Sequence, residues 1–485
     1  MRRIWAVTRQ TFIEILRMRR TTLFIFILAA VVLGVPQLPR LFNKDVKPQT
    51  AALSAGKPGA VQAPQAAQRH HVQTFLVYSV GLAGIILSLL TILAGCKIIC
   101  EEQARRYVFT PLTKPVPRWQ YVIGRWAGLV LFQMLMIAAV GLAVYGTAQV
   151  LRLNVKDRAE RLQLDNQVFA GRYRSAPNSL DEDLPKVAAK IMQQREQNER
   201  LKDLSPEQIA ASWDNARLLA REALENVAPF GRLGWRFTEL PKPLNDNALV
   251  EFHFTAGTGK AAAGTGLKGI FLFSRDPNSE DAGAYFRSDA TFLTDRDSSI
   301  LLPAHMVGSD GRLFVEFLNE NPGDPAATFD TTLMFPPEEL YIIYPVAPFE
   351  PNFLRLLLMM LILQVFLAST TLLAGTWLSF PVATLMCLTI YAIGAMQRFL
   401  VEATAIRYKS GFWVYLGHYI YGGLQHIMPN FELIDTSTVL MDSLVVPWTR
   451  LAVAGVAFVG VWTVLALTVA AFVFTKRELA SVIVE

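Results

Sequence analysis

The sequence has few cysteines and no phosphate-binding loop. Its three cysteines, Cys96, Cys100 and Cys387, lie in or at the ends of apolar segments, so no disulfide framework is predicted. Cys96 and Cys100 are one helical turn apart, but no His or third Cys is near them in the sequence, which favours two apolar residues of a membrane helix over a metal site. No Gly-Lys pair precedes Ser or Thr, so the chain is not expected to contain its own ATPase.

Charged residues are scarce as well. They make up 18% of the 485 residues, whereas hydrophobic residues make up 52%, and the mean hydropathy is positive at +0.31. This proportion of apolar residues is high for a soluble protein and favours a membrane protein. The net charge of +6 does not come from one basic patch, so we expect no nucleic-acid partner.

Six apolar segments resemble membrane-spanning helices in length and composition. Basic residues cluster where the positive-inside rule requires them, and both termini are therefore predicted to lie in the cytoplasm. The stretch 398–409 departs from the rule, because it would place three bases outside. The predicted spans are residues 22–38, 72–99, 121–151, 353–378, 382–400 and 451–474.

The first twenty residues are basic and amphipathic. The segment has six arginines and a single acid, Glu14, with apolar residues between them. This pattern predicts a helix on the cytoplasmic membrane surface. A signal peptide has the same order of charges. No small-x-small cleavage site follows Val35-Pro36, however, so we expect residues 1–20 to be retained ahead of the first membrane region, 21–151.

Two other segments are neither spans nor domains. Residues 40–71 are rich in Ala, Gln, Pro and Gly and predict a flexible external loop, with His70-His71 at its end as a solvated pair rather than a metal site. Within the second membrane region, 350–485, residues 411–427 are aromatic and too short to span, which predicts an interfacial or re-entrant helix. His418 and His426 are interpreted as interfacial histidines.

Between the membrane regions, residues 152–349 predict an inserted domain outside the membrane. Helix-forming residues over 181–227 predict a helical hairpin, and alternating short apolar runs over 235–345 predict a small antiparallel β-sandwich. The glycine-rich stretch 256–269 lies between two strands and is interpreted as a hairpin loop. The fold class is thus a polytopic α-helical membrane protein of six spans with an inserted α+β extracytoplasmic domain.

A few polar side chains interrupt the apolar spans. Gln133 in the third span, and Gln364, Ser369 and Thr370 in the fourth, would line a path through the membrane or bond to neighbouring helices and their own carbonyls. In the insert, Asp295, Asp297 and His305 are close in sequence. An acidic turn before a strand explains them, so a membrane-anchored hydrolase is the weaker hypothesis.

The segment 101–125, EEQARRYVFTPLTKPVPRWQYVIGR, separates the second and third spans. It has paired acids followed by bases in helical spacing, then a Lys-Pro-Val-Pro-Arg break and Gly124-Arg125 at the start of a span. This order resembles the first cytoplasmic loop of ABC transporter permeases of the type-2 export class, and the ending Phe-Thr-Lys-Arg-Glu-Leu is similar to that family's C-terminal pattern. An ordinary charged loop is the alternative.

The resemblance implies a function for this segment. Residues 98–120 would form a coupling loop that docks on a separate ABC ATPase, which binds ATP and Mg, and residues 1–20 would be the elbow helix. It also implies a non-catalytic inner-membrane export subunit with no cofactor of its own, working with a second permease chain, identical or not. The implied ATPase-coupling residues are Glu101, Glu102, Arg105, Arg106, Lys114, Pro115 and Arg118.

A second hypothesis keeps the ATPase but dispenses with transport. In it, ATP-driven motion reaches the domain at 152–349, which acts on an envelope protein. The size of the insert and the scarcity of ionisable residues in the spans favour this alternative.

Overall fold

The computed structural model divides the chain into two compact units. One comprises Met1–Leu164, Glu350–Asp442 and Val446–Glu485, and the other comprises Asp165–Phe349 and Ser443–Val445. The described residues are 2–34, 63–104, 117–155, 157–198, 206–258, 266–275, 285–308, 310–319, 332–336, 339–397, 399–400, 419, 422–423 and 429–476. The predicted helix 411–427 falls largely outside these residues, as does the predicted loop 40–71 up to residue 62. Its last part, 63–71, is not a loop but belongs to the helix Ala63–Ala104, because the apolar second span continues the helix beyond its expected start.

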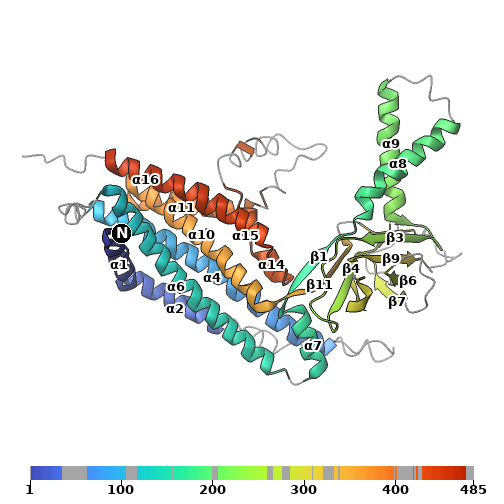
Figure 1. Cartoon of the computed structure of the whole chain (residues 1–485), viewed down its shortest axis with the longest axis horizontal. Helices are drawn as coiled ribbons and strands as arrows, with labels where there is room; N and C mark the ends of the chain where they lie inside the picture. The colour runs from blue at the N-terminus through green and yellow to red at the C-terminus, as the bar shows by residue number, and fades with distance from the viewer. Residues whose placement is uncertain are drawn as a thin grey trace, which may run out of the picture. The chain divides into compact units, whose positions relative to one another are not determined.

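The first unit is helical (Figure 1). Its described part contains four helices that are long and apolar enough to cross a membrane, at Val72–Glu101, Arg118–Leu153, Phe349–Trp377 and Trp448–Lys476. The predicted first and fifth spans correspond to shorter apolar helices, Thr21–Ala30 and Phe380–Ala395. The elements are α1 (Arg2–Arg17), α2 (Arg19–Gly34), α4 (Ala63–Ala104), α6 (Arg118–Leu153), α10 (Phe349–Trp377), α11 (Phe380–Ala395), η6 (Phe431–Ile434), α14 (Ser437–Met441), α15 (Trp448–Ala454), η7 (Gly455–Thr463) and α16 (Val464–Lys476).

Local sequence sets several of these helix boundaries. Pro117 stands at the N-cap of α6, where a residue without an amide hydrogen leaves no donor unsatisfied. Ser379 is the N-cap of α11, and Pro381 lies in its first turn, so the chain turns sharply between α10 and α11 as the sequence predicts. The last span is continuous through a π-helical stretch, η7.

Small residues let α1 approach α6 closely. A Cβ atom built on Gly124 would come within 2.7 Å of the Val7 Cβ atom, and one on Gly128 within 2.5 Å of the Thr11 Cβ atom. These two glycines are four residues apart and lie on one face of α6. Val7, Thr11 and Ile15 of α1 are correspondingly buried. The basic N-terminal helix is thus amphipathic, and one of its sides packs against α6.

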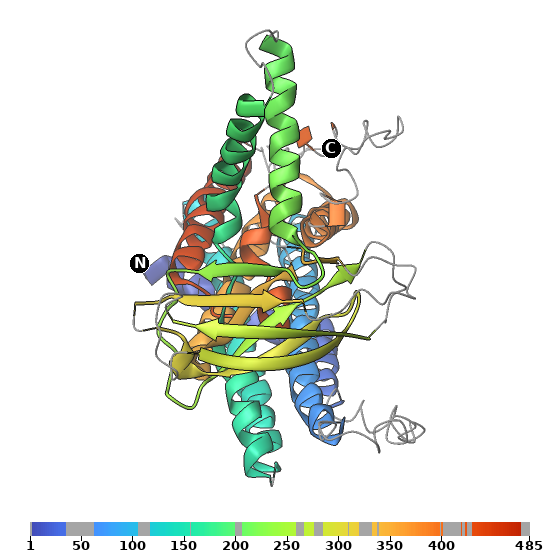
Figure 2. The same ribbon diagram turned by 90° about the vertical axis from the view of Figure 1, so that its right-hand side faces the viewer.

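The second unit contains antiparallel sheets, as the alternating pattern predicts (Figure 2). The described strands form sheets in the orders β1-β11-β4-β8, β3-β9-β6-β7 and β2-β10-β5. Helix α7 (Arg158–Gln167) precedes them in the chain, and α8 (Ser179–Asn198) packs against α9 (Pro206–Glu225). The strands are β1 (Ala170–Ser175), β2 (Asn226–Val227), β3 (Arg232–Phe237), β4 (Leu249–Phe254), β5 (Gly257–Thr258), β6 (Gly266–Ser274), β7 (Tyr285–Leu293), β8 (Ser298–Pro303), β9 (Leu313–Leu318), β10 (Leu333–Met334) and β11 (Tyr341–Pro348), with η4 (Ala304–Met306) after β8.

Phenylalanine rings fill the space between the two larger sheets. The rings of Phe252 on β4 and Phe271 on β6 lie 5.6 Å apart, and Phe271 is 4.7 Å from Phe317 on β9. All three side chains are fully buried. Each edge-on or tilted pair adds about 1 kcal/mol beyond the burial of its apolar area. This core makes the two sheets a sandwich.

The unit also takes in a short piece of chain from the second membrane region. The amide of Arg172 on β1 donates to the Ser443 carbonyl at 2.8 Å, and the Val445 amide donates to the Arg172 carbonyl at 2.8 Å. Residues 443–445 thus run beside β1 as a parallel bridge. Their sequence, Ser-Leu-Val, is too short to show an alternating pattern and gave no sign of this pairing.

Candidate functional site

The predicted coupling segment begins at the end of α4. Lys97 and Glu101 form an i,i+4 ion pair there, with 3.5 Å between nitrogen and oxygen. The backbone of Glu102 is helical and belongs to α4. The other predicted coupling residues before Pro117 lie outside the described residues: Arg105, Arg106, Lys114 and Pro115.

Arg118 lies at the other end of that segment and contacts another helix. Its guanidinium donates to the carbonyl oxygens of Phe474 and Thr475, each at 3.0 Å. These carbonyls belong to the last turn of α16, where unpaired acceptors and the helix dipole favour a cation. Tyr121, one turn further along α6, stacks on the Phe474 ring at 5.8 Å. The start of α6 and the end of α16 are therefore tied together.

A second connection holds α1 against α6. Arg125 is only 1% exposed, and its guanidinium donates to Glu14 Oε2 at 2.7 Å and to Thr11 Oγ1 at 3.1 Å. Its Nε atom donates to the Tyr121 hydroxyl at 3.1 Å. A buried cation is stable only when paired and hydrogen-bonded, and these contacts supply that pairing. These contacts tie the first turns of α6, which follow the predicted coupling segment, to α1.

The sequence contains a signal for this connection in the two charges themselves. Arg125 is a charge at the start of an apolar span, and Glu14 is the one acid in the basic N-terminal helix. Opposite charges that each look out of place are candidates for a buried pair. Their separation of more than a hundred residues left the pairing to the tertiary structure.

Deeper in the first unit, polar side chains of α4 and α10 meet. The Gln364 amide nitrogen donates to Ser88 Oγ at 3.0 Å, and its carbonyl oxygen accepts from Thr91 Oγ1 at 2.5 Å. All three side chains are buried. Gln364 also lines a cavity of about 500 Å³ bordered by Tyr78, Met360, Tyr391, Phe431 and Glu432. A mostly apolar cavity with a few polar groups can take a small amphipathic molecule.

The other predicted path-lining residues have different surroundings. Ser369 and Thr370 donate to the carbonyl of Phe366 in their own helix, at 2.7 and 3.0 Å, and Ser369 lies 3.4 Å from Thr463 Oγ1 of η7. Gln133 is fully buried in α6, and among the described residues neither atom of its side-chain amide has a hydrogen-bond partner. A buried amide without a partner lowers stability. Of the predicted path-lining residues, Gln133 is therefore the one that packing and hydrogen bonding explain least.

The second unit contains an ionic network around Glu251. The carboxylate accepts from Arg172 at 2.5 Å, and His253 lies between Glu251 and Asp297, at 3.2 Å from each. Burial would raise the pKa of Glu251, but the hydrogen bond from His253 and the charge of Arg172 outweigh it and hold the pKa at about 2. Burial lowers the pKa of His253, yet its bonds to the two acids raise it above the ordinary value.

This network accounts for one member of the acidic turn singled out in the sequence, since Asp297 pairs with His253. Asp295 adopts a positive φ of 57° in the turn between β7 and β8. Among the described residues, no group of three or more His, Cys, Asp or Glu side chains is arranged so that it could hold a metal ion. Nothing in this arrangement brings Asp295, Asp297 and His305 together as a reactive centre.

The structure defines a polytopic helical membrane protein with a separate β-rich unit. Residues 5–170 match the family of ABC-2 family transporter proteins, and this match covers about a third of the chain. No curated protein and no solved structure matches the chain.

The match confirms the resemblance drawn from residues 101–125, because it spans that segment and the helices on both sides. The chain therefore carries an ABC-2 transporter membrane domain, of the kind found in permeases of ABC transporters. Such permeases are generally non-catalytic and partner with an ABC ATPase.

Proposed function

We propose that this chain is the permease subunit of an ATP-driven exporter. The observation that carries the proposal is the ABC-2 match over residues 5–170, together with the charged segment between α4 and α6 inside it. A separate ATPase would bind ATP and Mg, dock on residues 98–120, and drive transport through a pair of permease chains, identical or different.

The contacts at both ends of that segment support force transmission. At its start, the pair of Lys97 and Glu101 extends α4 as a helix to Ala104. At its end, Arg118 joins α6 to α16, and Arg125 joins α6 to α1. A push on the segment would reach the ends of α1, α4, α6 and α16 together, because each link is an ion pair or a charge-assisted hydrogen bond.

The polar interior supplies the proposed path. Gln364, which is hydrogen-bonded to Ser88 and Thr91, borders the cavity, and Gln133 is a buried amide without a described partner. Both are suited to bind polar groups of a cargo that crosses an apolar interior. In this proposal the chain has six spans, cytoplasmic termini and an external second unit, and resides in the inner membrane.

Charge reversal tests the docking assignment. The double change Glu101→Lys and Glu102→Lys would abolish co-purification with the partner ATPase and lower the ATPase activity of the reconstituted complex. Glu222→Lys on exposed α9 is the control and would leave both unchanged. Full ATPase association and activity in the double variant would refute the docking assignment.

One observation favours the alternative, in which the complex transmits force without transport. The chain enters or leaves the second unit at Asp165, Phe349, Ser443 and Val445, which gives motion of the first unit more than one covalent route to it. Val446, the residue after it, is held by α10 through Asn352 Oδ1 and Arg355, at 2.8 and 3.1 Å. ATPase activity stimulated by an envelope protein and by no lipid or small molecule would select this alternative over export.

A further inference from the structure

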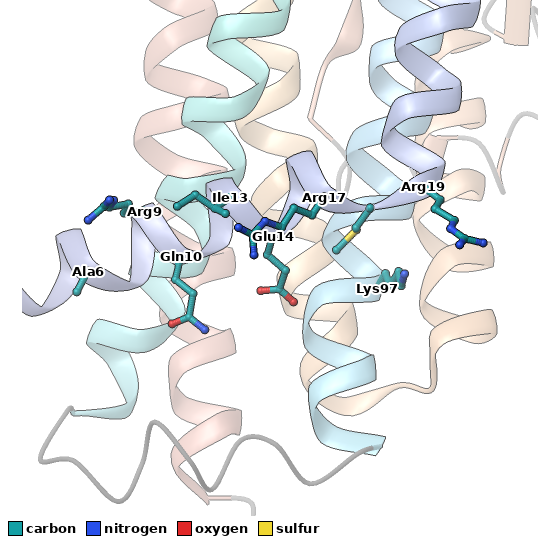
Figure 3. A pocket seen from close by; sticks show the side chains of 9 residues that line it. Ala6, Arg9, Gln10, Ile13, Glu14, Arg17, Arg19 and Lys97 are labelled. Carbon is teal, nitrogen blue, oxygen red and sulfur yellow. The ribbon is translucent and has the colours of Figure 1, made fainter.

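A basic pocket lies beside the junction of α1 and α2, apart from the proposed path. It has a volume of about 800 Å³, within the usual range for small-molecule sites. Figure 3 shows Gln10 and Glu14 extending from α1 to the same side, with Lys97 on the neighbouring α4. The pocket therefore joins the N-terminal helix to the helix that leads into the coupling segment.

The charges around this pocket are mostly positive. Among the described residues, it is lined by Arg9, Arg17, Arg19 and Lys97 against one carboxylate, Glu14. Glu14 is already paired with Arg125 at 2.7 Å, so its negative charge is largely compensated from inside the protein. Arg9, Arg17 and Arg19 are exposed. An open pocket with this charge attracts an anion, and arginine forks match a phosphate group.

An apolar stripe begins at the same place. Leu23, Phe26 and Ile27 follow Arg19 at spacings of four, seven and eight residues, which places all four on one face of α2. The apolar side chains of this stripe are 59%, 70% and 41% exposed. A ligand whose anionic group lies among the arginines would thus have an uncovered apolar surface directly beside it.

We infer that this pocket binds the phosphate group of an anionic phospholipid, with the acyl chains lying along Leu23, Phe26 and Ile27. Free phosphate offers the same oxygens to Arg9, Arg17 and Arg19 but has nothing to cover the stripe. The adjoining apolar surface is the reason the lipid is the favoured source. This inference concerns a ligand of the permease itself and is independent of the ATPase and the cargo.

Binding here has a consequence for the coupling segment. Lys97 lines the pocket and also pairs with Glu101. A phosphate within reach of Lys97 competes with Glu101 for its charge. Lipid occupancy would then weaken the ion pair at the end of α4 and loosen the start of the segment that the ATPase is proposed to push.

The test uses the full chain purified in detergent and measures binding by native mass spectrometry. Three probes are compared at equal concentrations: short-chain phosphatidylglycerol, phosphatidylcholine of the same chain length, and inorganic phosphate. We expect phosphatidylglycerol to bind at least tenfold more tightly than the other two. The double variant Arg9→Gln with Arg17→Gln should weaken that binding roughly tenfold to thirtyfold, since each base near an anionic lipid contributes about a factor of five.

The control variant has the same change of charge elsewhere. Arg2→Gln with Arg158→Gln removes two exposed bases outside the pocket and should leave phosphatidylglycerol binding within twofold. The melting temperatures of both variants establish that each is folded, and Lys97→Gln gives an independent variant of the pocket. Equal binding of phosphatidylcholine, equally tight binding of inorganic phosphate, or unchanged binding in the Arg9 and Arg17 variant would each overturn the inference.

Discussion

Arg125 on α6 and Glu14 on α1 form an ion pair of 2.7 Å in which the arginine is buried and the glutamate reaches the surface. The two residues are 111 positions apart, and both lie within the segment that matches the transporter family. Their pairing fixes the N-terminal helix to the first membrane helix after the coupling segment. Arg9 and Arg17 of α1 line the pocket beside this pair.

Removing either partner of this pair should destabilise the protein. Arg125→Ala would cost about 3 kcal/mol, the low end for breaking a buried pair, because Glu14 remains partly solvated. Glu14→Gln keeps a hydrogen-bond acceptor but leaves the buried Arg125 cation without its counter-charge, so it would also cost about 3 kcal/mol. Thermal unfolding in detergent measures both. Unchanged stability in either variant would contradict the arrangement.

The glycines of α6 give a matched pair of substitutions. Gly128→Ala would push against Thr11, whose hydroxyl accepts from Arg125, and should cost about 1 to 3 kcal/mol. Gly146→Ala lies on the same helix with no heavy atom within 4 Å of the added Cβ, so it should be neutral or stabilising by up to about 1 kcal/mol. Melting temperatures compare the variants, and similar losses in both would show that α1 does not pack at Gly128.

Gln133 and Gln364 should respond differently to replacement by leucine. Gln133→Leu removes an amide that has no described partner and should leave stability unchanged or raise it by about 1 kcal/mol. Gln364→Leu breaks two hydrogen bonds and should lower stability by about 1 kcal/mol. The loss is modest because Ser88 keeps its bond to the Gly84 carbonyl and the single Thr91 hydroxyl proton can turn wholly to the Leu87 carbonyl.

Unfolding in detergent distinguishes the two variants. A larger loss for Gln133→Leu than for Gln364→Leu would show that Gln133 has a structural partner. If Gln133 lines the path as proposed, its leucine variant would remain stable while the complex loses transport-linked ATPase activity.

The second unit should be most stable at mildly acidic pH. The pKa of Glu251 is lowered to about 2 from the ordinary 4.5, so its contribution of about 3 kcal/mol is present above pH 4.5 and is lost as the pH falls toward 2. The pKa of His253 is raised, so its contribution is present below pH 6.5 and is lost as the pH rises through the folded-state pKa. Maximum stability therefore falls between pH 4.5 and about 6.5.

The measurement is the melting temperature of the full chain in detergent across this pH range. His253→Gln should abolish the loss of stability on the alkaline side, because glutamine does not titrate. His305→Gln is the control, since its side chain is exposed and lies outside the network. A wild-type protein that gains stability between pH 6 and pH 8.5 would contradict the charged state assigned to His253.

Much of the secondary structure was readable from local patterns. The alternating runs at Leu249–Phe254 and Leu313–Leu318 became β4 and β9, and the proline and serine signals marked the starts of α6 and α11. Shorter or less regular runs such as Arg232–Phe237, which is β3, carry charges and a glycine that obscured the pattern. The pairing of β1 with residues 443–445 had no local signal at all.

The sequence by itself determined that the chain is a membrane protein with a charged segment between two apolar helices, because hydropathy and charge order depend only on neighbouring residues. It also identified the family resemblance from that segment. Only the tertiary structure decided that Arg125 meets Glu14, that Gln364 meets Ser88 and Thr91, and that Arg9 and Arg17 of α1 border a pocket with Lys97. These contacts join residues far apart in the chain, and which of them form depends on how the helices pack.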